Sequence, residues 1–191
     1  MNSRHLDLPE LLSPAGNRES LEFALAYGAD AVYFASTSFG MRAGAANFEL
    51  EQIEDAVKFV HSKGAKSYLA SNIIPRNDDL KGLPDFLERV ADTGIDALIV
   101  ADLGVLSLAK KHAPHTDLHV STQLGVTNYM TALHLCELGV KRIVLSRELN
   151  LNEIHEIRSR IPPEVELECF VHGSMCVSFS GRCLISNYMV G

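Results

Sequence analysis

The sequence lacks the features of a secreted, membrane-spanning or disordered protein. Met1 to Glu10 contain no apolar core of a signal peptide, and no uncharged run approaches the ~20 residues that a helix needs to cross a bilayer. We therefore predict a cytoplasmic protein without a membrane segment. Hydrophobic residues make up 47% and charged residues 21% of the 191 residues, which excludes disorder and predicts a globular chain with a sizeable core.

An excess of positive charge is also missing. The 17 Lys and Arg residues are outnumbered by 24 Asp and Glu residues, which gives a net charge of −7. Phosphate contacts need clustered Lys and Arg side chains, so this balance argues against a free-standing nucleic-acid binder with a basic face. An RNA partner would need a local patch of positive charge or help from another part of a longer protein.

Several common catalytic and nucleotide-binding motifs are absent. No Walker loop or Gly-x-Gly-x-x-Gly supports a nucleotide cofactor, and no Gly-x-Ser-x-Gly elbow supports a serine hydrolase. His155-Glu156 is not followed by the second histidine of a zincin helix. In the cytoplasm the four cysteines are expected to be reduced, which predicts core thiols, metal ligands or nucleophiles rather than disulfides.

Short β-rich runs alternate with amphipathic helical patterns along the whole chain, which is typical of repeated βα units. In the helical stretches, apolar residues recur three or four positions apart, as in Leu50, Ile53, Val57 and Val60 or in Leu83, Phe86, Leu87 and Val90. The expected strands are Glu10 to Ser13, Ala31 to Ala35, Ser67 to Asn72, Ala97 to Ala101, Leu118 to Thr122, Arg142 to Ser146 and Val165 to Val171.

This series predicts an α/β fold: a parallel (β/α)8-type, TIM-like barrel that is incomplete, with about seven βα units. We expect one barrel-type domain over residues 1–191, since no Ser- or Pro-rich linker divides the chain. A complete barrel typically needs ~250 residues, and the eighth strand is missing. The chain also stops soon after a cysteine-rich loop, so we expect it to be the N-terminal part of a longer protein.

Ligands of parallel α/β folds bind at the carboxyl ends of the strands, where this sequence is notably polar. The residues that follow the expected strands are Ser13 to Gly16, Arg42, Asn72, Asp102, Ser121 with Gln123, Arg147 with Glu148, and His172 with Gly173. Loops are generally polar, so each residue alone also fits a purely structural role. As a set they predict a site at one mouth of the barrel.

Side chains along the seventh expected strand alternate between its two faces. Val165, Leu167, Cys169 and Val171 share one face, and the opposite face carries Glu168 and His172. The apolar face should meet the helices, which would place Glu168 and His172 inside the barrel and Cys169 against the helix layer. Cys136 shares an apolar helical stripe with Leu133, so we expect Cys136 and Cys169 to be core thiols.

Cys176 and Cys183 lie in a loop rich in small residues beyond the seventh strand. Two thiolates complete neither a tetrahedral zinc site nor an iron–sulfur cluster, so if they are ligands we expect the other two beyond Gly191. An alternative is a thiolate–imidazolium pair of Cys176 with His172, which would support nucleophilic catalysis.

One segment carries a specific family resemblance. Glu168-Cys-Phe-Val-His-Gly-Ser-Met-Cys-Val-Ser-Phe-Ser-Gly-Arg-Cys-Leu-Ile-Ser186 resembles the signature of peptidase family U32. Other stretches similar to that family are Glu10-Leu-Leu-Ser-Pro-Ala-Gly16, Tyr27-Gly-Ala-Asp-Ala-Val-Tyr33 and Leu145-Ser-Arg-Glu-Leu149. The resemblance covers the chain and implies the N-terminal barrel of longer family members.

The resemblance implies either of two activities. The family name implies proteolysis, whereas other branches hydroxylate a tRNA wobble uridine or an rRNA cytidine in a prephenate-dependent way, and related members carry a [4Fe–4S] cluster. The segments Ser146-Arg-Glu-Leu149 and Phe170-Val-His-Gly173 are most similar to the tRNA branch. By the same resemblance, Cys176 and Cys183 correspond to the first two cluster ligands.

We therefore predict an iron–sulfur-dependent, prephenate-linked enzyme that hydroxylates a pyrimidine in RNA. Its expected partners are tRNA or rRNA, a small dicarboxylate co-substrate and iron–sulfur delivery proteins. The alternative is a collagenase-like peptidase that uses Cys176 and His172 or an unrecognised site. The candidate catalytic residues are Glu168, His172, Arg147 and Asp102, and the candidate substrate-binding residues are Arg42, Asn72, Gln123 and Arg182.

Overall fold

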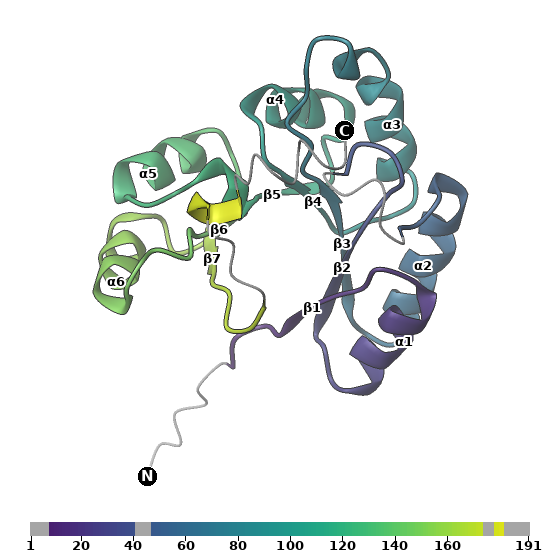
Figure 1. Ribbon diagram of the computed structural model, residues 1–191, viewed down its shortest axis with the longest axis horizontal. Coiled ribbons are helices and arrows are strands. Elements are labelled where there is room, and N and C mark those ends of the chain that lie inside the picture. Colours follow the sequence, from purple (N-terminus) through teal and green to yellow (C-terminus); the bar gives the residue numbers. More distant parts are fainter. Residues whose placement is uncertain (1–7, 41–46, 174–177, 182–191) are drawn as a thin grey trace.

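The structure is a computed structural model that describes residues 8–40, 47–173 and 178–181. Its seven strands form one sheet in chain order, and every neighbouring pair is parallel. The sheet curls, and the six α-helices lie on its outer side (Figure 1). The predicted α/β fold, an incomplete TIM-like barrel, is confirmed.

Each strand is short, and a helix or turn follows it. The strands are β1 (Leu12–Pro14), β2 (Ala31–Ala35), β3 (Lys66–Ser71), β4 (Ala97–Val100), β5 (Asp117–Val120), β6 (Arg142–Val144) and β7 (Glu166–Glu168). The α-helices are α1 (Arg18–Ala26), α2 (Leu50–Ser62), α3 (Leu83–Ala91), α4 (Leu103–His112), α5 (Tyr129–Glu137) and α6 (Leu151–Arg160). Three 3-10 turns are η1 (Asp79–Lys81), η2 (Thr122–Leu124) and η3 (Phe179–Gly181).

The helices form where the sequence provides both an apolar stripe and a start signal. In α3 the four residues of the predicted stripe are all buried against the sheet. Asn17, Asn128 and Asn150 each accept a backbone N–H bond at the start of α1, α5 and α6, which satisfies amides that have no partner inside the helix. Just past the end of α2, Gly64 takes a φ of +75°, which favours glycine.

The two faces of the sheet bury different kinds of side chain. The outer face carries Leu69, Leu98 and Ile143, which pack with the helices into the main core. The inner face carries a small apolar group, Ala31, Tyr68, Ala97 and Ile99, beside charged residues of β3, β6 and β7. The barrel interior is therefore partly polar, as expected from the alternation of Glu166 and Glu168 with Leu167.

The predicted end of the seventh strand is wrong: β7 ends at Glu168 rather than Val171. Its three residues pair with those of β6, and the last pair joins Glu168 to Val144, the last residue of that strand. Beyond Leu145 the chain turns away, because the Ser146 N–H donates to the Val126 carbonyl at 3.1 Å. The described residues that follow Glu168 therefore have no neighbouring strand to extend the pairing.

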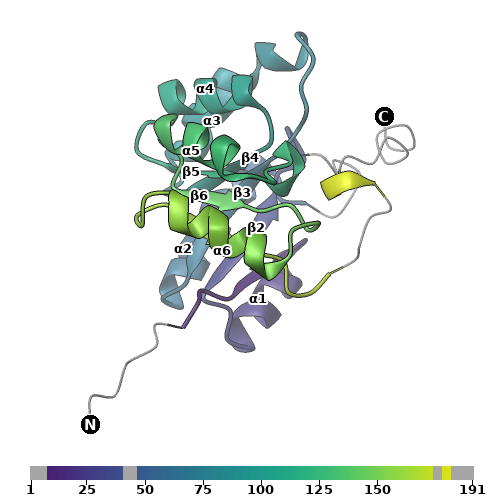
Figure 2. The same cartoon turned by 90° about the vertical axis from the view of Figure 1, so that its left-hand side faces the viewer.

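The barrel is open between its first and last strands. In the described part of the chain, β7 pairs with β6 and β1 pairs with β2, and the two edge strands do not pair with each other. A side chain spans the opening: Arg142 of β6 contacts Glu10, which precedes β1, at 2.8 Å. Figures 1 and 2 show the opening and the segment that leads into β1 beside it.

Candidate active site at the carboxyl ends of the strands

Two amides that follow different strands meet at the carboxyl mouth. Asn72, which follows β3, donates through Nδ2 to Gln123 Oε1 at 2.8 Å. Gln123 lies in η2, where Ser121 Oγ also donates to the same oxygen at 3.2 Å. Both predicted substrate-binding amides thus occupy one place, although they are far apart in sequence.

Arg147 and Glu148 follow β6 and hold two later segments of the chain. The Arg147 guanidinium carbon lies 4.0 Å from the centroid of the Phe170 ring. Glu148 accepts hydrogen bonds from the Ser180 N–H at 2.7 Å and from the Ser180 hydroxyl. These bonds stabilise the ionised carboxylate and lower the pKa of Glu148. The loop after β6 therefore organises both segments that follow β7.

Asp102, a candidate catalytic residue, is engaged in local structure. It caps the start of α4, where its Oδ1 accepts the N–H bonds of Gly104 at 2.8 Å and Val105 at 3.0 Å. Such bonds satisfy two amides that the helix leaves without partners. The geometry favours a structural role for this carboxylate.

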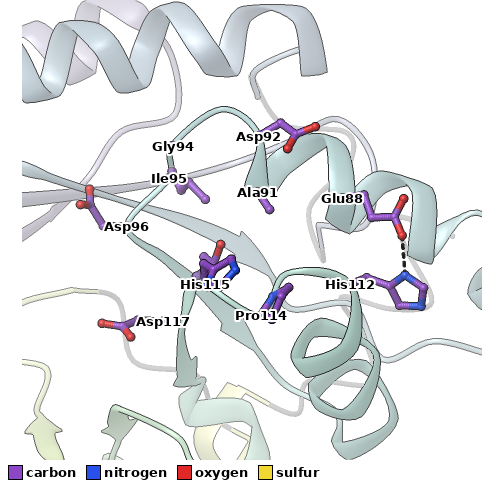
Figure 3. A pocket seen from close by; sticks show the side chains of 11 residues that line it. Glu88, Ala91, Asp92, Gly94, Ile95, Asp96, His112, Pro114, His115 and Asp117 are labelled. Atoms are coloured by element: carbon purple, nitrogen blue, oxygen red, sulfur yellow. Dashed lines mark hydrogen bonds and ion pairs between the residues drawn. The ribbon is translucent and has the colours of Figure 1, made fainter.

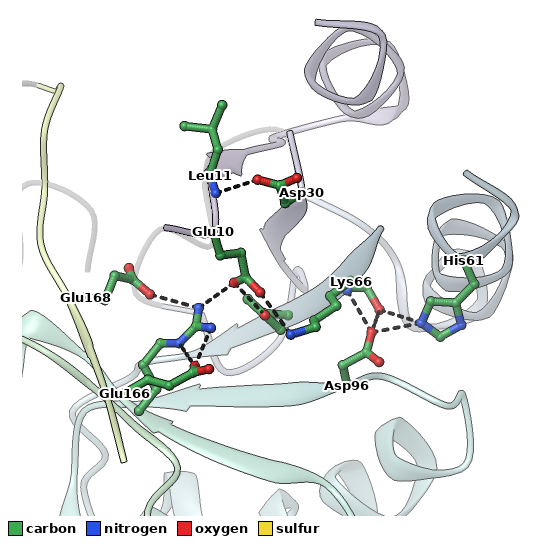
Figure 4. Close-up of polar contacts among 11 residues, drawn as sticks. Glu10, Leu11, Asp30, His61, Lys66, Asp96, Glu166 and Glu168 are labelled. Atoms are coloured by element: carbon green, nitrogen blue, oxygen red, sulfur yellow. Dashed lines mark hydrogen bonds and ion pairs between the residues drawn. The ribbon is translucent and has the colours of Figure 1, made fainter. Parts of the chain in front are cut away.

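Glu168 lies inside the barrel, as the alternation predicted, and contacts Arg142. Arg142 is the centre of a charged cluster: its guanidinium lies 2.8 Å from Glu10, 2.5 Å from Glu166 and 3.4 Å from Glu168. The Arg142 side chain is only 6% exposed. Figure 4 shows the three carboxylates converging from Glu10 and from β7, with Lys66 on the far side of Glu10.

The pKa values of two carboxyls in this cluster move in opposite directions. Burial would raise the pKa of Glu10, but hydrogen bonds from Arg142, Lys66 and Tyr68 outweigh it and lower that pKa to about 2. For Glu168, burial prevails over the longer contact with Arg142 and raises the pKa above its usual value. Glu10 is therefore a permanent anion, whereas Glu168 is the carboxyl better suited to carry a proton.

The structure contradicts two expected side-chain positions. His172 is exposed rather than inside the barrel, and Cys169 is exposed rather than packed against the helix layer. Both errors have one cause, because the strand alternation that placed them stops at Glu168. Cys136 is partly buried and packs against the core as expected. Four predicted site residues lie outside the described part of the chain: Arg42, Cys176, Arg182 and Cys183.

The interior residues that surround Glu168 were missed by the sequence interpretation. His119 of β5 stacks edge-on against Tyr68 with ring centroids 4.7 Å apart, and no described residue bonds its Nδ1 atom. Burial and then the charge of Arg142 lower the pKa of His119 to about 3, so it is neutral. The sequence could have indicated both residues. Arg142 and His119 each lie at an inward-facing position of a short buried strand, where a polar side chain needs hydrogen-bond or ion-pair partners.

Two hollows in the described part of the chain lie at the opposite end of the barrel from the amide pair. The larger, of about 700 Å³, lies between the ends of α3 and α4, where His112 pairs with Glu88 at 2.7 Å (Figure 3). The smaller, of about 240 Å³, is lined by Lys66, His119 and Arg142 among others. We assign the chemistry to the carboxyl mouth despite the size of these hollows, since the amino end of such barrels usually serves stability.

Within residues 8–40, 47–173 and 178–181, no group of three or more His, Cys, Asp or Glu side chains is placed to hold a metal ion. No helix of this part is long and apolar enough to span a membrane.

Comparison with known proteins gives one family. The model of "Peptidase family U32" matches residues 16–191. The chain is 48% identical over 183 residues to tRNA hydroxylation protein P of Helicobacter pylori (strain ATCC 700392 / 26695), covering 95% of the chain and 43% of that protein. It is 40% identical over 182 residues to the 23S rRNA 5-hydroxycytidine C2501 synthase of Escherichia coli K12, covering 95% of the chain and 27% of that protein.

The chain thus spans less than half the length of these curated relatives. Among solved structures, it resembles the U32 peptidase Mk0906 with a TM-score of 0.72 at 20% identity, covering 88% of this chain and 71% of that one. At this identity the likeness supports the fold alone.

Proposed function

Because the chain belongs to peptidase family U32, we propose that it forms the barrel of an enzyme that hydroxylates a pyrimidine in RNA, with a tRNA wobble uridine as the favoured substrate. The observation that carries this proposal is the 48% identity, over nearly the whole chain, to a protein named for tRNA hydroxylation. The identity to an rRNA 5-hydroxycytidine synthase supports the same chemistry on a second RNA.

The carboxyl mouth offers groups suited to this substrate. A pyrimidine presents amide-like donors and acceptors on its edge. Asn72 and Gln123, whose side chains meet at this mouth, are the residues that we propose to bind it. Glu168 is the proposed proton carrier, because burial raises its pKa. Prephenate is the proposed co-substrate, and its carboxylates would require cations, for which we propose Arg147, Arg42 and Arg182.

We further propose a [4Fe–4S] cluster, with Cys176 and Cys183 as two of its ligands. In support of this proposal, Ser180 lies between the two cysteines in sequence and donates hydrogen bonds to Glu148 at the mouth. Cys136 is unsuited to such a site because it packs on α5 against the core. When bound, the cluster supplies one-electron chemistry. Assembly would require iron–sulfur delivery proteins, as expected for such clusters.

The decisive experiment combines metal analysis with RNA analysis. The full-length protein is purified without oxygen and assayed for iron and sulfide, and nucleosides from a deletion strain are measured by mass spectrometry. Cys176→Ser should abolish both the cluster absorbance and the hydroxylated nucleoside, because an iron loses its thiolate. Cys136→Ser is the matched control and should restore the nucleoside in the deletion strain.

A different set of results would support the peptidase alternative. An iron-free protein, an unchanged nucleoside profile in the deletion strain, and cleavage of a peptide that depends on Cys176 would together establish the peptidase alternative. Variation at His172 would then test the proposed thiolate–imidazolium pair.

A further inference from the structure

Two exposed phenylalanines flank the carboxyl mouth, and two consecutive residues of one loop hold them there. We propose that Phe170 and Phe179 are stacking platforms for unpaired bases of the RNA, which Arg147 and Glu148 keep in position. This inference rests on the proposed function and names the residues that would bind the RNA.

Phe170 is held by a stacked cation. It is 40% exposed, and the Arg147 guanidinium carbon lies 4.0 Å from its ring centroid. This distance is typical of a cation placed over an aromatic face. The contact fixes the plane of the ring although Phe170 lies beyond the end of β7. A ring fixed in this way loses little freedom when a base stacks on it.

Phe179 is held through its neighbour. It is 48% exposed, whereas Ser180 is only 2% exposed and donates hydrogen bonds from its N–H and its hydroxyl to Glu148. Ser180 has φ 37° and ψ 46°, a left-handed conformation that non-glycine residues adopt at a cost. The two hydrogen bonds offset that cost and hold η3 against η2, the turn that contains Gln123. Phe179 is thereby kept at the surface beside the amide pair.

The same loop anchors both rings. Arg147 and Glu148 follow Ser146, whose N–H is bonded to the Val126 carbonyl. The platforms therefore share one support and flank Gln123 and the end of the strand that carries Glu168. An unpaired nucleotide and its neighbour could each stack on one ring, while the pyrimidine edge faces the amides.

The charge of the chain favours bases over other occupants. With a net charge of −7, this chain itself gains little affinity from phosphates, so the contact with RNA that its exposed rings offer is base stacking. Arg147 adds a positive charge beside one platform, which suits an RNA strand better than an apolar protein segment. Stacking also requires unpaired bases, such as those of an anticodon loop.

The test measures binding of the full-length protein to a fluorescent RNA hairpin that carries the unmodified anticodon loop, by anisotropy at one fixed salt concentration. Phe170→Ala and Phe179→Ala should each weaken binding roughly 5- to 100-fold, the range found for lost base stacking. Phe→Tyr at either position should retain binding, whereas Phe→Leu should weaken it, because leucine is apolar but has no aromatic face.

Tyr27→Ala is the matched control, since Tyr27 is an 85% exposed aromatic residue at the far end of α1. It should bind the hairpin as the wild type does. Double-variant cycles test whether Glu148 acts through Phe179. The losses of binding free energy caused by Glu148→Ala and Phe179→Ala should be non-additive, whereas those caused by Glu148→Ala and Phe170→Ala should be additive. Thermal melting of every variant separates lost binding from lost folding.

The inference would be overturned if Phe170→Leu and Phe179→Leu bound the hairpin with wild-type affinity, or if Tyr27→Ala lost as much affinity as the phenylalanine variants. It would also be overturned if the phenylalanine variants lost thermal stability rather than affinity. That result would indicate that another protein segment covers the rings. If the platform variants bind normally and RNA is still hydroxylated, only this inference fails. If the wild type neither binds the hairpin nor supports hydroxylation, the proposed function fails as well.

Discussion

Arg142 connects more charged groups than any other residue described here. We expect Arg142→Met to lower the free energy of unfolding by about 2–4 kcal/mol, because it leaves Glu168 in the barrel without its cation and Glu10 with Lys66 alone. Urea denaturation at pH 7 measures the change. Lys58→Met is the control: its ion pair with Glu54 is exposed on a helix, so the loss should be much smaller than that of Arg142→Met. Equal losses would disprove the importance of the cluster.

His119 should make the fold sensitive to acid. Its pKa falls from 6.5 to about 3 on folding, so the unfolded chain binds the proton first. The stability that neutral His119 provides is complete above pH 6.5 and is lost as the pH falls toward 3, at up to about 1.4 kcal/mol per pH unit. His119→Phe should remove this slope while keeping an aromatic ring against Tyr68. Denaturation curves at pH 6.5 and 5 compare the two proteins, and parallel curves would contradict the assignment.

At the scale of single elements, two substitutions of Asp102 distinguish its role as the cap of α4 from a catalytic role. Asp102→Ala should cost about 1 kcal/mol, because the amides of Gly104 and Val105 lose their acceptor. Asp102→Asn should keep both the stability and the hydroxylated nucleoside, since asparagine is an equally good cap. A stable Asp102→Asn protein that no longer modifies RNA would instead show that the carboxylate takes part in the chemistry.

Elements differ in how much of them the sequence can predict. The helix faces were predictable because an apolar stripe such as that of α3 is a local pattern. The end of β7 was not, because it depends on where β6 stops, and apolar residues continue past Glu168. Cys169 and His172 were misplaced for this reason. That Asn72 and Gln123 lie at the same mouth was predictable because polar residues after parallel strands gather at one edge, whereas their mutual hydrogen bond depends on side-chain conformations that no local pattern encodes.

At the scale of the whole molecule, Glu10 helps to close the open side of the barrel. Its pKa of about 2 lies below the ordinary 4.5, so its contribution is present above pH 4.5 and is lost as the pH falls toward 2. Glu10→Gln should therefore be less stable than the wild type at pH 7, by about 1–3 kcal/mol, and the two should converge near pH 2. A difference that stays constant over this range would show that charge is not the cause.

The order of the strands also has a consequence for the kinetics of folding. Every pair of neighbours in the sheet is also adjacent in the chain, so each strand can add to an edge that already exists, from β1 onward. The contact between Arg142 and Glu10 joins distant parts of the chain and can form only after β6 has arrived. Loss of this contact should therefore accelerate unfolding and leave the refolding rate nearly unchanged, as stopped-flow measurements on Arg142→Met would show. The barrel would then be assembled in the order of synthesis and closed by its charges at the last step.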